Sequence, residues 1–129
     1  MITLHTTPRV IQSQDEERFF LSAISNWQLN TRPTSWHPPV DVFESDKFII
    51  IRMEIAGMKE SDFRIGVSKN MVSISGVRID RTPRDACHQL EIYFGEFSAE
   101  ISISIPFKVD SVEALYSDGF LQITLPKED

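Results

Sequence analysis

Cys87 and His88 are the neighbouring side chains of this sequence that could carry covalent chemistry. A nearby imidazolium lowers the pKa of a thiol and so produces a nucleophilic thiolate. Adjacent residues of an extended chain point to opposite faces, however, so the two side chains need not meet. The other histidines, His5 and His37, are scattered and have no Glu or Cys at metal-ligand spacing. We therefore expect no catalytic residue, no metal site and no cofactor.

Motifs for serine nucleophiles and for nucleotide binding are both missing from the sequence. It has no G-x-S-x-G elbow, the strained turn that presents a catalytic serine. It also has no G-x-x-x-x-G-K-[ST] loop to bind phosphates. The serines alternate with apolar residues in the predicted strands, a pattern typical of a solvated face. These features predict a protein that is not an enzyme and has no ATP-driven cycle.

Length and composition predict a single domain with a terminal arm. The chain has 129 residues, of which 41% are hydrophobic and 25% charged, as in ordinary globular domains. Its net charge of −6 repels phosphate backbones and anionic lipid, so neither nucleic acid nor a membrane is an expected partner. The longest apolar run, Phe48 to Ile51, is too short to span a bilayer. Because the N-terminus has no signal-peptide pattern, we expect a cytoplasmic location.

Residues 1–35 form the predicted arm, partly helical or flexible. The sequence has no glycine before Gly57, and its β-type alternation begins only near Val40. Ser13 and Glu16 match a capping box, and apolar residues recur at helical spacing over Asp15 to Gln28. A helix of this length is marginal in water, so its apolar face needs a partner surface, either its own domain or another molecule. The residues at helical spacing are Phe20, Ala23, Ile24 and Trp27, and the aromatic residues of the face are Phe19, Phe20 and Trp27.

Residues 36–129 form the predicted β domain. Short runs rich in Ile, Val and Phe are separated by turn residues such as Ala56-Gly57, Lys69-Asn70 and Ser117-Asp118-Gly119. The pattern predicts an all-β, immunoglobulin-like antiparallel sandwich. The expected strands cover Val40 to Glu44, Phe48 to Ile55, Phe63 to Val67, Met71 to Val77, Phe97 to Ile105 and Phe120 to Leu125.

Motifs in a fixed order run through the β domain. Ala114-Leu-Tyr-Ser-Asp-Gly-Phe-Leu121, followed by Leu125-Pro-Lys127, is similar to an A-x-x-x-N-G-x-L signature with a closing L-P-K. Asn70-Met-Val-Ser-Ile-Ser-Gly-Val-Arg78 is similar to an N-x-L-x-I-x-G-x-R strand. Together with Pro39 to Glu44, Ile55 to Ile65 and Tyr93 to Phe97, these segments resemble the small heat-shock protein family and its alpha-crystallin domain over residues 36 to 127.

The resemblance implies an ATP-independent holding chaperone that binds unfolding client proteins and prevents their aggregation. It implies that Phe19, Phe20, Ile24 and Trp27 of the arm bind clients. It also implies a groove for hydrophobic I-x-I peptides between the strands Phe63 to Ser68 and Val112 to Tyr116. The groove residues would be Ile65, Val67, Val112 and Ala114.

The polar segment from Arg78 to Glu91 is either an ordinary surface loop or a dimerisation element. In bacterial and plant members of the family, such a loop crosses to pair with the first strand of the partner. Loops of this length commonly carry function. The resemblance therefore implies a homodimer, with higher oligomers left open. Its interface would comprise Val40, Val42, Phe43, Leu90 and Ile92.

Two departures from the family pattern affect assembly. Ala99 stands at the position of a usual Arg, so an ion pair that this Arg makes across the dimer is missing or replaced. No I-x-I segment follows Pro126, so large regular oligomers are not expected and the groove ligand would come from elsewhere. The segments considered for that role are Ile2-Thr-Leu4 and Val10-Ile11 of the arm.

Two other function classes compete with this interpretation. An adaptor sandwich of the co-chaperone type would bind one folded partner and would have no promiscuous arm. A carbohydrate-handling or hydrolytic sandwich would need a converging polar cleft. Trp27 and Trp36 both lie outside the predicted strands, which argues against an aromatic stacking platform for a sugar.

Overall fold

The computed structural model describes residues 9–11 and 35–129. The helix predicted over Asp15 to Gln28 therefore lies outside the described residues. Among the described residues, two single turns of 3₁₀ helix, η1 (Glu60–Asp62) and η2 (Val109–Ser111), interrupt an otherwise all-β structure. The strands are β1 (Arg9–Ile11), β2 (Val40–Glu44), β3 (Phe48–Glu54), β4 (Phe63–Ser68), β5 (Met71–Arg78), β6 (Gly95–Ser102), β7 (Glu113–Ser117) and β8 (Phe120–Pro126).

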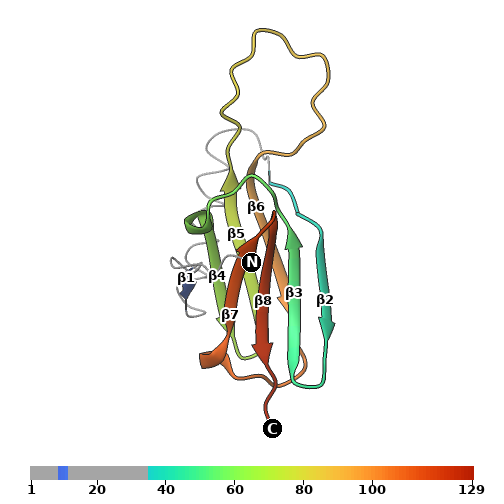
Figure 1. The fold of residues 1–129 in the computed structure, drawn as a ribbon, viewed down its shortest axis with the longest axis vertical. Helices are drawn as coiled ribbons and strands as arrows, with labels where there is room; N and C mark the ends of the chain where they lie inside the picture. The colour runs from blue at the N-terminus through green and yellow to red at the C-terminus, as the bar shows by residue number, and fades with distance from the viewer. Residues whose placement is uncertain (1–8, 12–34) are drawn as a thin grey trace.

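The strands form two sheets packed against each other (Figure 1). One sheet has the order β1-β4-β5-β6 and the other β2-β3-β8-β7. Neighbouring strands are antiparallel except for β1 and β4, which run parallel. The predicted antiparallel sandwich is confirmed. Its strands agree with the sequence pattern to within a few residues at their ends.

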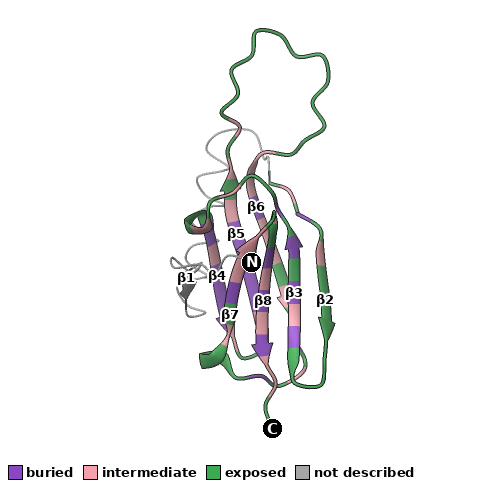
Figure 2. Ribbon diagram, in the orientation of Figure 1, coloured by how far each residue is buried: buried purple, intermediate pink, exposed green. Residues whose placement is uncertain are grey.

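The core lies between the two sheets and follows the period-two alternation of the strands. On β3, Ile49, Ile51 and Met53 are buried while the residues between them are more exposed (Figure 2). In the register, Ile51 pairs with Ile123 and Met53 with Leu121 on β8, so both strands present apolar side chains to the same face. Burying one such side chain stabilises the fold by about 1.5–3 kcal/mol.

Two serines of β5 contradict the prediction of a solvated serine face. Ser73 and Ser75 are both buried. They lie in a strand that has β4 on one side and β6 on the other, where Arg64 pairs with Ser75 and Glu100 with Ser73. Alternation alone therefore does not decide exposure in a central strand.

The strand predicted over Phe97 to Ile105 is wrong at its C-terminal end. β6 stops at Ser102, and the amide of Ile103 donates instead to the carbonyl of Asn70 at 2.9 Å, in the turn between β4 and β5. Pro106 follows and has no N–H to continue a ladder. Ile103 nevertheless stays buried, so the hydrophobic pattern continues past the end of the strand.

The hairpin between β7 and β8 turns as its sequence predicts. Asp118 has φ of 53° and Gly119 φ of 82°, the pair of positive values that a tight two-residue turn requires. The amide of Ile55 donates to the carbonyl of Gly119 at 2.8 Å, which attaches the turn to the end of β3. Leu121, two residues later, is fully buried. The turn therefore sets which face of β8 enters the core.

Candidate functional site: the sandwich edges and the β5–β6 loop

β2 is an edge strand whose apolar side chains face solvent. Among the described residues it pairs with β3 alone, so one side of its backbone is open to another strand. Val42 is 48% exposed and Phe43 45%, while Val40 is half-buried. The guanidinium of Arg52 lies 5.3 Å from the Phe43 ring centroid and 2.9 Å from a carboxylate oxygen of Asp41. The edge therefore offers both backbone groups and an apolar surface.

The loop of residues 79–94 projects beyond the end of the sandwich (Figure 1). This stretch contains no helix or strand in the single chain. Leu90 is 67% exposed and Ile92 71%. Side chains of this size lose about 1.5–3 kcal/mol when left in water rather than buried. The loop thus presents an apolar surface that its own chain does not cover.

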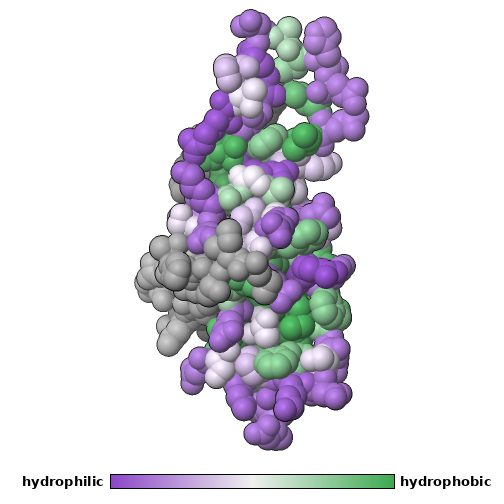
Figure 3. All heavy atoms as spheres, viewed as in Figure 1, coloured by the Kyte–Doolittle hydropathy of each residue, from purple (hydrophilic) through white to green (hydrophobic). Residues whose placement is uncertain are grey.

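The surface view places hydrophobic side chains among hydrophilic ones on the loop and beside it, and again lower on the same face (Figure 3). Four of the five residues predicted for a dimer interface are exposed, namely Val42, Phe43, Leu90 and Ile92. They come from two separate regions of the single chain, the β2 edge and the β5–β6 loop. A contact between them requires a second molecule or a movement of the loop.

β7 is an edge strand of one sheet, and β4 lies next to the edge strand β1 of the other; the predicted groove residues on and beside β4 and β7 all belong to or pack against the core between the sheets. Ile65, Val67 and Ala114 are buried and belong to the hydrophobic core, and Val112 is half-buried against it. In this chain they line the interior between the strands rather than an open surface. A peptide would reach these side chains only if the residues that now cover them moved aside.

β1 pairs with that edge. Its backbone runs parallel to β4, with Val10 opposite Ile65 and Ile11 opposite Gly66. Val10-Ile11 is one of the two arm segments that the sequence suggested as an internal groove ligand, and the strand pairing agrees with that suggestion. Adding an extended segment to a sheet edge is a common mode of peptide recognition. Residues 9–11 thus lie along β4 as a parallel neighbour.

Tyr116 joins the two sheets beside the predicted groove. Its hydroxyl donates to the carbonyl of Ile55 at 2.7 Å and accepts from the amide of Met58 at 3.3 Å. Its ring lies 5.0 Å from that of Phe63 on β4. Burial raises the pKa of Tyr116, and the Met58 amide and the positive charge of Arg78 oppose that rise. The sequence signature contains this tyrosine but gives no signal for these contacts.

Of the residues considered for chemistry, His5 lies outside the described residues. Cys87 is exposed in the loop, as is His88. Within residues 9–11 and 35–129, no group of three or more His, Cys, Asp or Glu side chains could hold a metal ion. None of the helices in this part of the chain has the length and apolar character needed to cross a membrane.

Comparison with known proteins gives a consistent match. Residues 41–129 match the Hsp20/alpha crystallin family. The chain is 27% identical to small heat shock protein C2 of Rickettsia felis over 71% of this chain and 61% of that protein. It is 28% identical to heat shock protein 16 of Schizosaccharomyces pombe over 76% of this chain and 71% of that protein.

A solved structure agrees with the sequence match. Heat shock protein 16.0 from Schizosaccharomyces pombe superimposes with a TM-score of 0.67 at 28% identity, covering 73% of this chain and 89% of that one. The region that matches the family begins within β2 and contains β3 to β8. The chain therefore belongs to the Hsp20/alpha-crystallin family of small heat-shock proteins, which are ATP-independent chaperones and not enzymes.

Proposed function

We propose that this protein is a holdase that works as a homodimer. It binds unfolding client proteins without ATP and keeps them from aggregating. Small heat-shock proteins as a class bind unfolded clients and form oligomers. In this chain the client-binding surface is the arm of residues 1–35, and the side chains that contact clients are Phe19, Phe20, Ile24 and Trp27.

The observation that supports the dimer is the presence of two uncovered surfaces on the single chain. Leu90 and Ile92 are exposed on a projecting loop, and β2 has an open edge beside the exposed Val42 and Phe43. When the loop segment becomes extended and pairs with β2 of a second copy, the open β2 edge gains backbone hydrogen bonds. The exposed apolar side chains of the loop and of β2 are buried in the same step. Val40 lies at the start of the same edge.

The β4 edge is the second binding surface of the proposal. Ile65, Val67, Val112 and Ala114 take an extended apolar segment, and β1 of the arm is the ligand in the resting chain. When the arm engages a client, β1 leaves and the edge becomes available for a further strand. Higher oligomers form by the same exchange between dimers.

Charge keeps the loaded chaperone in solution. The net charge of −6 leaves the exterior well hydrated while apolar surfaces hold the client. The same charge disfavours nucleic acid and anionic membranes as partners. A cytoplasmic location stays a prediction from the sequence.

A thermal aggregation assay tests the holdase. A heat-labile enzyme is warmed without ATP, alone or with the full chain at a near-equal molar ratio, and light scattering is followed. We expect the full chain to suppress most of the scattering and the chain lacking residues 1–35 to lose that effect. A full chain that leaves scattering unchanged, yet binds one folded protein with defined stoichiometry, would instead support the adaptor class.

A further inference from the structure

We propose that Arg78 is the positioning residue of the β5–β6 loop. Its guanidinium holds the base of the loop so that Leu90 and Ile92 project in the orientation that a second copy binds. This proposal rests on the loop-mediated dimer proposed above. In this proposal Arg78 acts through the residues that it holds.

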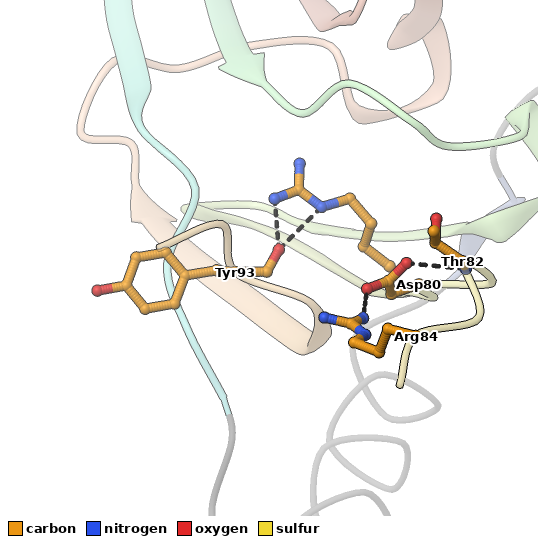
Figure 4. Close-up of polar contacts among 5 residues, drawn as sticks. Asp80, Thr82, Arg84 and Tyr93 are labelled. Carbon is orange, nitrogen blue, oxygen red and sulfur yellow. Dashed lines mark hydrogen bonds and ion pairs between the residues drawn. The ribbon is translucent and has the colours of Figure 1, made fainter. Parts of the chain in front are cut away.

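The guanidinium of Arg78 joins three parts of the chain. Arg78 ends β5 and pairs with Gly95 at the start of β6, so it stands where the loop leaves and returns. Its Nε donates to the carbonyl of Tyr93 at 3.0 Å, and one Nη donates to the same oxygen (Figure 4). The other Nη donates to the carbonyl of Ala56 at 3.2 Å, and Ala56 follows β3 of the opposite sheet. Arginine is suited to this role because its donors diverge in one rigid plane.

Aromatic rings hold the same guanidinium from the side. Its central carbon lies 4.5 Å from the ring centroid of Trp36 and 5.1 Å from that of Phe94, within the range of cation–π attraction. Trp36 also stacks on Tyr93, with centroids 5.6 Å apart and planes 18° from parallel. The indole N–H of Trp36 donates to the carbonyl of Gly95 at 3.4 Å. The returning end of the loop is therefore held by both polar and aromatic contacts.

The outgoing end of the loop is ordered independently. The amide of Thr82 donates to a carboxylate oxygen of Asp80 at 3.0 Å, a side-chain turn that directs the backbone. Arg84 forms an ion pair with the other carboxylate oxygen of Asp80 (Figure 4). Both ends of the loop thus make defined contacts, and Leu90 between them is exposed.

These contacts affect the position of the loop more than the stability of the fold. The hydrogen bonds from Arg78 to Tyr93 and Ala56 are exposed, so water replaces them when the guanidinium is removed. A freed loop then has many more orientations, and dimerisation must restrict them. Preorganisation of this kind strengthens binding without adding a contact to the interface.

The first test measures dimerisation of the full chain by sedimentation over a dilution series. We expect Arg78→Gln to raise the dimer dissociation constant about tenfold, since it removes charge-assisted bonds and the cation–π contacts. Arg78→Lys keeps a positive charge near the indole of Trp36 but loses the planar set of diverging donors. Its dimer dissociation constant should therefore lie between those of the parent and of Arg78→Gln. Lys108→Gln, which removes an exposed cation near the C-terminus, is the matched control and should leave the constant unchanged.

The second test reads loop orientation without any contribution from dimer contacts. Cys87 is the single cysteine and is exposed in the loop, so it accepts a spin label at one site. At a dilution where the chain is monomeric, the label should be more mobile in Arg78→Gln than in the parent, with the melting temperature nearly unchanged. If Arg78→Gln does not fold, Arg78→Lys takes its place in both tests.

The outcomes separate the two proposals. If the Arg78 variants dimerise like the parent with unchanged label mobility, while Leu90→Ser with Ile92→Ser dissociates the dimer, the role of Arg78 is overturned and the loop-mediated dimer stands. If the Leu90 and Ile92 variant also dimerises like the parent, the loop-mediated dimer is overturned, and the role of Arg78 with it. An equal loss of stability and dimerisation in Arg78→Gln and Arg78→Lys would make Arg78 a structural residue only.

Discussion

The hydroxyl of Tyr116 donates a hydrogen bond to the carbonyl of Ile55 at 2.7 Å, across 61 positions of sequence. Ile55 follows the end of β3, and Tyr116 lies on β7 at the far edge of the same sheet. The tyrosine ring also packs on Phe63 of β4, in the opposite sheet. The side chain of Tyr116 on β7 thus contacts both the segment after β3 and β4, the other strand of the predicted groove.

Replacing Tyr116 with Phe should destabilise the domain while keeping the ring contact with Phe63. The carbonyl of Ile55 and the amide of Met58 would each lose a hydrogen-bond partner. We expect a loss of about 1–2 kcal/mol in the free energy of unfolding, and a melting temperature lower by about 4–8 °C for each kcal/mol. Calorimetry measures both. Tyr93→Phe, which keeps the stacked ring on Trp36, is the control and should melt like the parent.

Stability should fall on the alkaline side because of the same tyrosine. Burial raises the pKa of Tyr116 above its ordinary value of 10.0, so the folded protein retains the phenol proton more tightly than the unfolded chain does. Its contribution is complete below pH 10.0 and is lost as pH rises from that value through the folded pKa. Urea unfolding at a series of alkaline pH values measures this slope. In Tyr116→Phe the slope should be reduced; an identical slope in the variant would exclude this residue as its source.

Gly76 on β5 has no room for a side chain. A Cβ at this position would lie 2.7 Å from the ring of Phe97 and 2.8 Å from the backbone carbonyl of Asp62. Because the carbonyl cannot move as a flexible side chain can, Gly76→Ala should cost about 1–3 kcal/mol of stability through overpacking. Chemical denaturation provides the value. Val77→Ala, at an exposed neighbouring position, should change the stability by much less.

The apolar side chains of the loop should be required for dimerisation and not for folding. Leu90→Ser combined with Ile92→Ser removes two exposed apolar groups, so the melting temperature of the monomer should hold while the dimer dissociates at higher concentration. Sedimentation velocity at several concentrations measures the change. Ile79→Ser removes an apolar group of similar exposure from the other end of the loop and should leave the dimer intact. Equal weakening by both variants would mean that general loop hydrophobicity matters, and not the proposed interface.

Deleting residues 1–12 should open the β4 edge. The deletion removes β1, so backbone groups around Ile65 and Gly66 lose their neighbouring strand. Hydrogen exchange of the β4 amides should become faster, while that of β8, which lies in the interior of the other sheet, should stay the same. The mass of the oligomer in solution should also change. Unchanged exchange in β4 together with an unchanged mass would argue against β1 as the ligand of this edge.

The sequence by itself determined the sandwich, most strand positions and the family. Alternating apolar residues define which face of β3 and β8 is buried, and Asp118-Gly119 supplies the two positive φ values that the last hairpin needs. These features depend on residues close together in sequence, so a local pattern reveals them. The order of the motifs then identified the family that the comparisons confirm.

Only the tertiary structure decided the contacts that position the site. Arg78 meets Tyr93 from 15 positions away across the β5–β6 connection, and Ala56 from 22 positions away. Ala56 follows β3 of the opposite sheet, so it becomes a neighbour of Arg78 only once the two sheets have stacked. The burial of Ser73 and Ser75 likewise depends on which strands flank β5. A local pattern records which side of a strand a residue faces, but the packing of distant strands determines what covers that side.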